Sequence, residues 1–195
     1  MRRLVVPLLA IVLALVAGRA HAGPPTDQLK AGIDRVLVIL QDPALKTPAK
    51  AEERRQKIRA IANEVFDWQE TGKRALARHW QARSPQERDE FSKLFADLLE
   101  RSYIGKIETY SGGERVQYLG EFPDGDLVTV RTRIVTKAGT EIPIDYRMHR
   151  AGDRWLVYDV VIEGVSLVAN YRTQFNRIIQ QTSFKDLLAK LAAKK

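Results

Sequence analysis

The spacing of apolar residues changes twice along this chain, and this pattern constrains the fold more than any other feature of the sequence. Up to about residue 110 the apolar side chains recur every three or four positions, as in amphipathic helices. From Glu114 they alternate with polar residues, as in half-buried strands, and beyond Ile162 the helical period returns. Helices, then consecutive strands, then helices predict an α+β fold with helices packed on one face of a sheet.

The strongest local signal for a helix is Ser84-Pro85-Gln86-Glu87. Ser84 can cap the helix, Pro85 suits its first position, and Glu87 can complete a capping box. A long helix is therefore predicted to begin here, with one wide apolar face behind the cap. The apolar residues of that face are Phe91, Leu94, Phe95, Leu98, Leu99, Tyr103, Ile104 and Ile107.

Four segments after residue 114 predict strands. Residues 128–134 and 142–148 each alternate between an apolar and a polar face, and Gly139 lies in the turn between them. Residues 155–162 are apolar on both faces apart from one aspartate, as expected of an interior strand, and residues 116–119 supply the fourth. We therefore expect a strongly twisted antiparallel sheet of about four strands.

The N-terminus has the composition of an export signal. Two arginines precede an almost wholly apolar run over residues 4–17, and Ala20-His21-Ala22 matches the small-x-small pattern of a cleavage site. The alternative, an uncleaved anchor, is disfavoured because about fourteen apolar residues are fewer than the roughly 20 that a spanning helix needs. We expect residues 1–22 to be a signal peptide, and the mature chain to be a soluble protein of the periplasm.

Cleavage would leave 173 of the 195 residues, enough for one domain with a sizeable core. We expect a single domain over residues 23–195, with a helical part over about 26–110, a sheet over about 114–163 and C-terminal helices over about 164–192. Loss of the three arginines in the signal lowers the formal net charge from +8 to +5, and the remaining charges are interspersed. This pattern disfavours a nucleic-acid partner but allows modest attraction to anionic lipid headgroups.

Few residues of the mature chain are suited to catalysis. It has no cysteine and only two histidines, His79 and His149, and no set of potential ligands has the spacing of a metal site. Residues 164–168 lack the second glycine of a nucleophile elbow. We therefore predict no catalytic residue, no metal and no cofactor. One enzymatic alternative stays open, a conical pocket for an apolar substrate, with Asp145, Asp159, Tyr146 and Tyr158 as candidate groups.

Two stretches together resemble a known family. The first includes Phe66-Asp67-Trp68, Arg78-His79-Trp80, residues 84–88, Phe91, Leu94-Phe95, Leu98-Leu99 and Tyr103. The second runs from Trp155 to Leu167 and continues through Asn170-Tyr171-Arg172 to Gln174-Phe175. These motifs resemble the MlaC family, known as periplasmic phospholipid-binding or toluene-tolerance proteins, over about residues 27–191. Trp68 departs from the usual phenylalanine but keeps an aromatic anchor.

The resemblance implies a nuclear-transport-factor-like sheet joined to a helical part, with acyl tails held between them. It also implies a monomeric, non-enzymatic phospholipid carrier that supports outer-membrane lipid asymmetry. Its partners would be an outer-membrane lipoprotein complex and an inner-membrane ABC transporter complex. A related branch is associated with hopanoid metabolism, so a hopanoid-associated lipid-binding protein is the alternative.

A lipid carrier needs a deep apolar cavity, because each methylene buried from water contributes about 0.8 kcal/mol. The long helix and one face of the sheet could line such a cavity, and an ordinary closed core is the alternative. The residues expected to contact lipid are Phe95, Leu99, Tyr103, Val128, Val130, Ile144, Tyr146, Met148, Tyr158, Val165 and Val168. The basic residues expected to contact headgroups or partners are Arg131, Arg133, Arg147 and Arg172.

Overall fold

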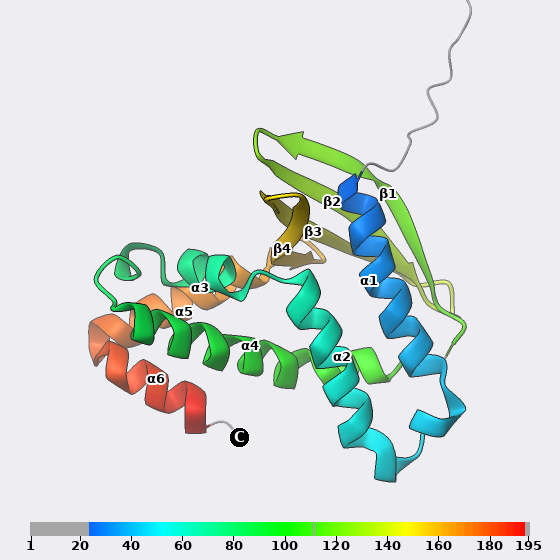
Figure 1. Cartoon of the computed structure of the whole chain (residues 1–195), viewed down its shortest axis with the longest axis horizontal. Helices are drawn as coiled ribbons and strands as arrows, with labels where there is room; N and C mark the ends of the chain where they lie inside the picture. Colours follow the sequence, from blue (N-terminus) through cyan, green and yellow to red (C-terminus); the bar gives the residue numbers. More distant parts are fainter. Residues whose placement is uncertain (1–23, 111, 194–195) are drawn as a thin grey trace, which may run out of the picture.

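The computed structural model describes residues 24–110 and 112–193, and it confirms the expected α+β fold (Figure 1). The expected signal peptide lies outside the described residues. In chain order the elements are α1 (Pro24–Gln41), the short turns η1 (Pro43–Leu45) and η2 (Pro48–Lys50), α2 (Ala51–Val65), α3 (Trp68–Leu76), η3 (Ala77–His79), α4 (Pro85–Glu108), β1 (Arg115–Asp124), β2 (Leu127–Val135), β3 (Glu141–Ala151), β4 (Arg154–Ile162), β5 (Val165–Ser166), α5 (Leu167–Gln181) and α6 (Phe184–Ala193).

The strands form one antiparallel sheet in the order β1-β2-β3-β4-β5. The four long strands lie where the sequence predicts strands, although β1 is longer than the expected residues 116–119, and β5 adds a fifth strand of two residues. The pairing shifts by one residue at Leu119 in β1 and at Tyr158 in β4. Such bulges bend a strand and increase its twist, so the sheet curves strongly.

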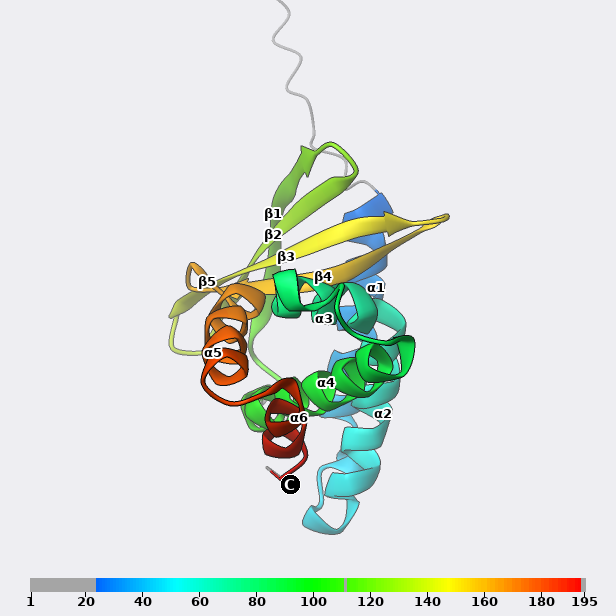
Figure 2. The same cartoon turned by 90° about the vertical axis from the view of Figure 1, so that its left-hand side faces the viewer.

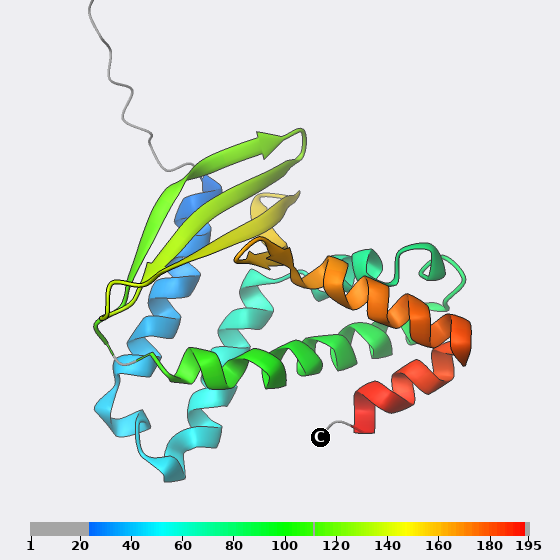
Figure 3. The same ribbon diagram turned by 180° about the vertical axis from the view of Figure 1, so that it is seen from behind.

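The two faces of the sheet differ in character. The inner face carries Val128, Val130, Met148 and Val157, which are buried and pack against Leu29 of α1. The outer face, on the opposite side, carries alternating polar residues of β2 and β3, and Figure 3 shows the sheet from this side with α1 behind it. The period-two alternation in the sequence therefore separates a core face from a polar face.

The helices α3 to α6 pack around a second, aromatic core beside the sheet (Figure 2). Phe91 and Phe95 of α4 meet Phe175 of α5, with ring centroids 5.4 Å and 5.1 Å apart and edge-to-face geometry. Phe184 and Leu187 of α6 complete this cluster, in which each of these residues is at most 6% exposed. The wide apolar face of α4 is thus covered mainly by other helices.

The capping box predicted at the start of α4 is confirmed. The backbone N–H of Glu87 donates to the Ser84 hydroxyl at 3.2 Å, and the Glu87 carboxylate accepts from the Ser84 N–H at 2.8 Å. Because these bonds satisfy backbone groups that a helix start leaves free, the sequence sets this boundary locally. None of the helices within residues 24–110 and 112–193 combines the length and hydropathy that a bilayer-spanning segment requires.

The far end of α4 is tied to α2 by a partly buried ion cluster. Glu108 accepts hydrogen bonds from Arg54 at 2.6 Å and from Arg55 at 2.8 Å, and its side chain is only 13% exposed. The hydrogen bond from Arg55 is the main cause that lowers the pKa of Glu108 below its usual value, although burial opposes the shift.

Replacing Glu108 by glutamine is expected to lower the free energy of unfolding by about 2 kcal/mol at neutral pH, because two charged hydrogen bonds weaken. The folded pKa is depressed, so this stabilisation is complete above the unfolded pKa, about 4.3, and is lost as the pH falls through the folded value. Urea unfolding of both proteins between pH 7 and pH 3 should show their difference shrinking in acid. Glu53→Gln is the control. Glu53 forms exposed ion pairs with Lys50 and Lys57, so this substitution should change the free energy of unfolding little.

Candidate functional site

The apolar residues expected to bind lipid fall into two separate clusters rather than one lining. Phe95, Leu99 and Val168 are buried in the aromatic core of the helices, and Tyr103 packs against that core. A second group, Val128, Val130 and Met148, is buried between the sheet and α1, with Tyr146 packed against it. Val165 is 57% exposed in β5, and Tyr158 lies at the bulge of β4.

A strip of half-buried apolar residues lies on the inner face of the sheet, next to the part that α1 covers. The register places Ile144 beside Ile162, and Tyr146 beside Val160, on this face. Ile142 extends the strip along β3, opposite Ile134. Each of these six residues of β2, β3 and β4 is half-buried, whereas Val130 and Met148 on the same face are completely buried. The strip is therefore the part of the inner face that packing within the chain leaves incompletely covered.

Two tyrosine hydroxyls lie on the inner face. The Tyr118 hydroxyl is buried and has no hydrogen-bond partner among the described residues. Burial raises the pKa of Tyr146 to about 12, and burial is also the main cause that raises the pKa of Tyr118. Both groups are thus neutral hydrogen-bonding groups at physiological pH. An unpartnered buried hydroxyl costs about 1 to 3 kcal/mol, so a polar atom of a ligand that reached it would be stabilised.

A polar cavity of about 380 Å³ opens on the outer face, between the sheet, α3 and the start of α5. We call it the arginine cavity. Its lining residues are Arg74, Asp124, Leu127, Val128, Thr129, Arg147, Tyr158, Asp159, Ser166, Val168, Ala169 and Arg172. Of the four arginines singled out in the sequence, the structure brings Arg147 and Arg172 together here and adds Arg74, which sequence reasoning missed.

Asp159 joins the sheet to α5 at the base of the arginine cavity. Its carboxylate is 4% exposed and accepts hydrogen bonds from Arg147 at 3.0 Å, from the Ser166 hydroxyl at 2.6 Å and from the Val168 N–H at 3.0 Å. The Ser166 hydroxyl in turn accepts from the Ala169 N–H and caps α5. These partners give Asp159 and Ser166 a structural role at the start of α5.

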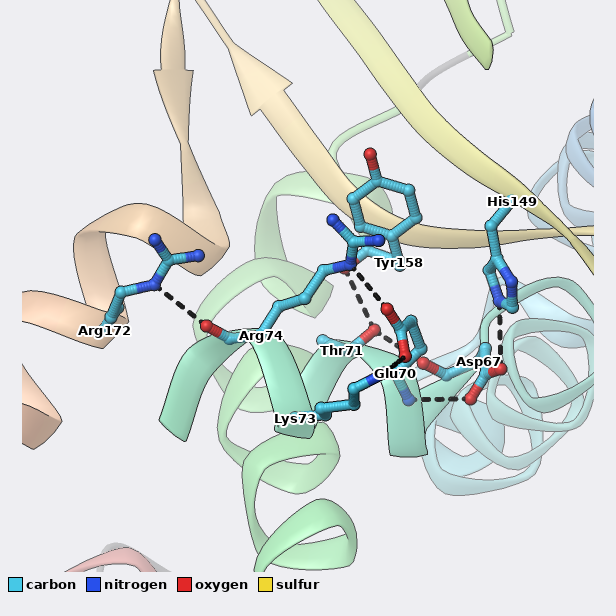
Figure 4. A network of polar contacts seen from close by, with 8 residues as sticks. All are labelled: Asp67, Glu70, Thr71, Lys73, Arg74, His149, Tyr158 and Arg172. Carbon is cyan, nitrogen blue, oxygen red and sulfur yellow. Dashed lines mark hydrogen bonds and ion pairs between the residues drawn. The ribbon is translucent and has the colours of Figure 1, made fainter. Parts of the chain in front are cut away.

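Arg74 and Arg172 lie side by side at the rim of the cavity, and Figure 4 shows Arg74 reaching from α3 to the Tyr158 ring. The Arg74 guanidinium lies 3.8 Å from the Tyr158 ring centroid and its Nε donates to Glu70 at 2.8 Å. The Nε of Arg172 donates to the backbone carbonyl of Arg74 at 2.9 Å. No sequence motif marks Arg74, because its position depends on the packing of α3 against β4 and α5.

Arg131 and Arg133 also lie on the outer face but do not line the arginine cavity. Each pairs across strands with an acidic residue of β3: Arg131 lies 3.7 Å from Asp145, and Arg133 contacts Glu141. The Arg131 guanidinium also covers the exposed ring of Phe122 at 4.0 Å. Their charges are therefore partly balanced within the sheet.

Both histidines among the described residues contact polar side chains of another element. The Nε2 of His149 in β3 lies 3.0 Å from Asp67, which also caps α3 by accepting from the Glu70 N–H (Figure 4). The Nε2 of His79 lies 3.0 Å from Asn176 of α5. These contacts tie the helices to the sheet and to each other.

Comparison of this fold with solved structures indicates the class of protein to which the chain belongs. It matches a phospholipid-binding protein from Ralstonia solanacearum, solved in complex with a phospholipid, with a TM-score of 0.75 and 25% sequence identity. The match covers 88% of this chain and 96% of that chain. The chain therefore has the fold of a phospholipid-binding protein.

The family follows from the sequence. The model of the MlaC protein family matches residues 30–193, so the chain belongs to the MlaC family and the resemblance of its two motifs is confirmed. A curated relative from Haemophilus influenzae (strain ATCC 51907 / DSM 11121 / KW20 / Rd), the intermembrane phospholipid transport system binding protein MlaC, is 25% identical over 124 residues. That alignment covers 62% of this chain and 58% of the relative, so the chain matches a little over half of the relative's length.

Proposed function

We propose that this protein binds a phospholipid non-covalently and carries it through the periplasm, without catalysing a reaction. The observation that carries the proposal is the match of 88% of this chain to a structure that holds a phospholipid, together with family membership over residues 30–193. The donor and acceptor would be an outer-membrane lipoprotein complex and an inner-membrane ABC transporter complex. Residues 23–195 would act as one lipid-binding domain.

The half-buried strip on the inner face is the proposed contact for the acyl tails. Ile144 and Tyr146 of β3 are its central members, and Tyr103 of α4 is a half-buried tyrosine on the helical side. The buried residues expected to bind lipid, such as Phe95 and Val130, would support this lining from behind. Hydroxyls on the inner face would donate hydrogen bonds to the ester oxygens of the lipid. A purely apolar core would have no need of such hydroxyls.

Carriage without catalysis is supported by the way the candidate catalytic groups are used. Asp159 and Ser166 are occupied in capping α5, and Asp145 pairs with Arg131. Tyr146 is protonated at physiological pH, as an ordinary tyrosine is, and burial raises its pKa further, to about 12. A carrier needs only to shelter the tails, and each buried methylene contributes about 0.8 kcal/mol to that sheltering.

We expect the purified protein to carry lipid that organic extraction releases unchanged. Mass spectrometry of the extract should show intact phospholipid at a substantial fraction of one molecule per protein. Hopanoid in place of phospholipid would favour the hopanoid-associated branch, and chemically altered lipid would favour an enzyme. Protein that is lipid-free in repeated preparations, and that takes no lipid from vesicles, would contradict the proposal.

A further inference from the structure

The arginine cavity is distinct from the strip proposed for the tails, because it opens on the outer face of the sheet. We propose that it binds a phosphate group, as a phosphate monoester or diester, through Arg74, Arg147 and Arg172. The inference rests on the proposed function only where the phosphate belongs to a lipid headgroup. The cavity itself is argued from its donors, charge and size.

Arg172 supplies donors that the rest of the chain does not use. Its Nε donates to the Arg74 carbonyl in the last turn of α3, where the carbonyl ends of the helix attract cations. Within residues 24–110 and 112–193, neither of its terminal nitrogens donates to another residue, and no carboxylate pairs with it. The guanidinium is therefore held in place by one bond while its outer edge stays open to a ligand.

Arg74 and Arg147 are each held by one carboxylate instead of a backbone carbonyl. Arg147 donates through a single nitrogen to Asp159, and Arg74 donates through Nε to Glu70 while it stacks on Tyr158. Both groups keep further N–H donors that have no acceptor among the residues the structure describes. A planar guanidinium that is fixed before binding suits the oxygens of a phosphate, which accept paired N–H bonds.

The charge and size of the cavity fit a phosphate. Three arginines and two aspartates line it, which leaves one net positive charge, and Asp159 is already satisfied by three hydrogen bonds. Its volume of about 380 Å³ lies within the roughly 300–1,000 Å³ of small-ligand pockets. An adjoining hollow shares Arg74 and Arg172 and adds Lys73 and Trp80, so a substituent on the phosphate would also find room.

The test is a titration of the delipidated full chain with inorganic phosphate, followed by NMR of the Val168 and Ala169 amides that line the cavity. Chloride at equal ionic strength controls for screening. Saturable shifts with a millimolar dissociation constant are expected. Arg172→Gln should raise that constant by about fivefold or more, because it removes one charged donor group and spares the carboxylates. Arg177→Gln is the matched control, an exposed arginine on the same helix outside the lining, and should stay within about twofold.

Three further arms identify the source of the phosphate, and each of their positive results supports the site. If the headgroup of a carried lipid fills the cavity, lipid-loaded protein should not bind inorganic phosphate. Glycerophosphocholine should then compete with inorganic phosphate for the delipidated protein. If the cavity meets a membrane surface, loaded protein should still bind phosphate. Arg172→Gln should then weaken sedimentation with phosphatidylcholine vesicles containing phosphatidylglycerol. Binding of inorganic phosphate alone would indicate a site for the free ion.

The inference is overturned if phosphate causes no saturable shift beyond that of chloride, or if Arg172→Gln and Arg177→Gln weaken binding equally. Lipid extraction from the same variants keeps this outcome separate from the proposed function. Protein that carries lipid but does not bind phosphate would refute the phosphate site alone. Protein that binds phosphate but never carries lipid would refute lipid carriage alone.

Discussion

Replacing Phe95 by alanine is expected to lower the free energy of unfolding of the lipid-free protein by about 4 kcal/mol. Phe95 is 1% exposed, and its ring centroid lies 5.8 Å from that of Phe91, 5.3 Å from that of Tyr171 and 5.1 Å from that of Phe175. Removal of the ring would leave a cavity that four helices cannot easily collapse, since α3, α5 and α6 all pack on α4. Urea unfolding of delipidated protein measures this loss directly.

The matched control is Ile107→Ala, further along the same helix, where the side chain is 39% exposed. It should cost well under about 1 kcal/mol, because little apolar surface is lost from the interior. The opposite result would also be informative, because the helical core and the inner-face cluster are separate. If Phe95→Ala left stability unchanged but reduced the lipid recovered by extraction, Phe95 would line the lipid cavity instead of closing a core.

Replacing Tyr146 by tryptophan is expected to reduce the lipid recovered per protein by about fivefold or more, because added bulk on the inner face competes with the tails. The thermal transition of the lipid-free protein should move by only a few degrees, since overpacking of about 1 kcal/mol shifts the midpoint of a chain of this size by roughly 2–4 °C. Mass spectrometry of extracts and calorimetry of delipidated protein give the two readouts.

Ile144→Trp, two positions along β3 on the same face, should show the same separation of lipid loss from stability. Val38→Trp is the control, because Val38 is 69% exposed on α1 and lies outside the strip. A steep fall in stability with full lipid occupancy would place Tyr146 in a closed core and move the tail site elsewhere. Equal lipid loss in all three variants would show that the effect is not specific to the strip.

Much of the fold could be predicted because the signals for it are local. The Ser84 capping box, the wide apolar face of α4 and the alternation along β2 and β3 each depend on residues within a few positions of one another. Local spacing alone sets which face of a helix or strand is apolar. β5 escaped prediction because two residues carry no detectable period and pair only after the turn that follows β4 returns the chain to it.

The candidate site could be predicted only in part, because apolar side chains give no sign of which cluster they will join. Phe95 and Val130 are both expected to contact lipid, and the structure places Phe95 in the core among the helices and Val130 beneath α1. Both are equally apolar in the sequence. What separates them is which element packs on each face, and that is fixed by contacts between distant parts of the chain.

By itself, the sequence determined the class of fold, the type and order of its main elements and the family to which the chain belongs, because periodicity, caps and motifs are properties of neighbouring residues. Only the tertiary structure decided which part of the inner face is left half-buried. It also decided that Arg74, Arg147 and Arg172 meet, since they come from α3, β3 and α5. The physical reason is that a binding site is made by side chains whose backbones approach only when helices and sheet pack against one another.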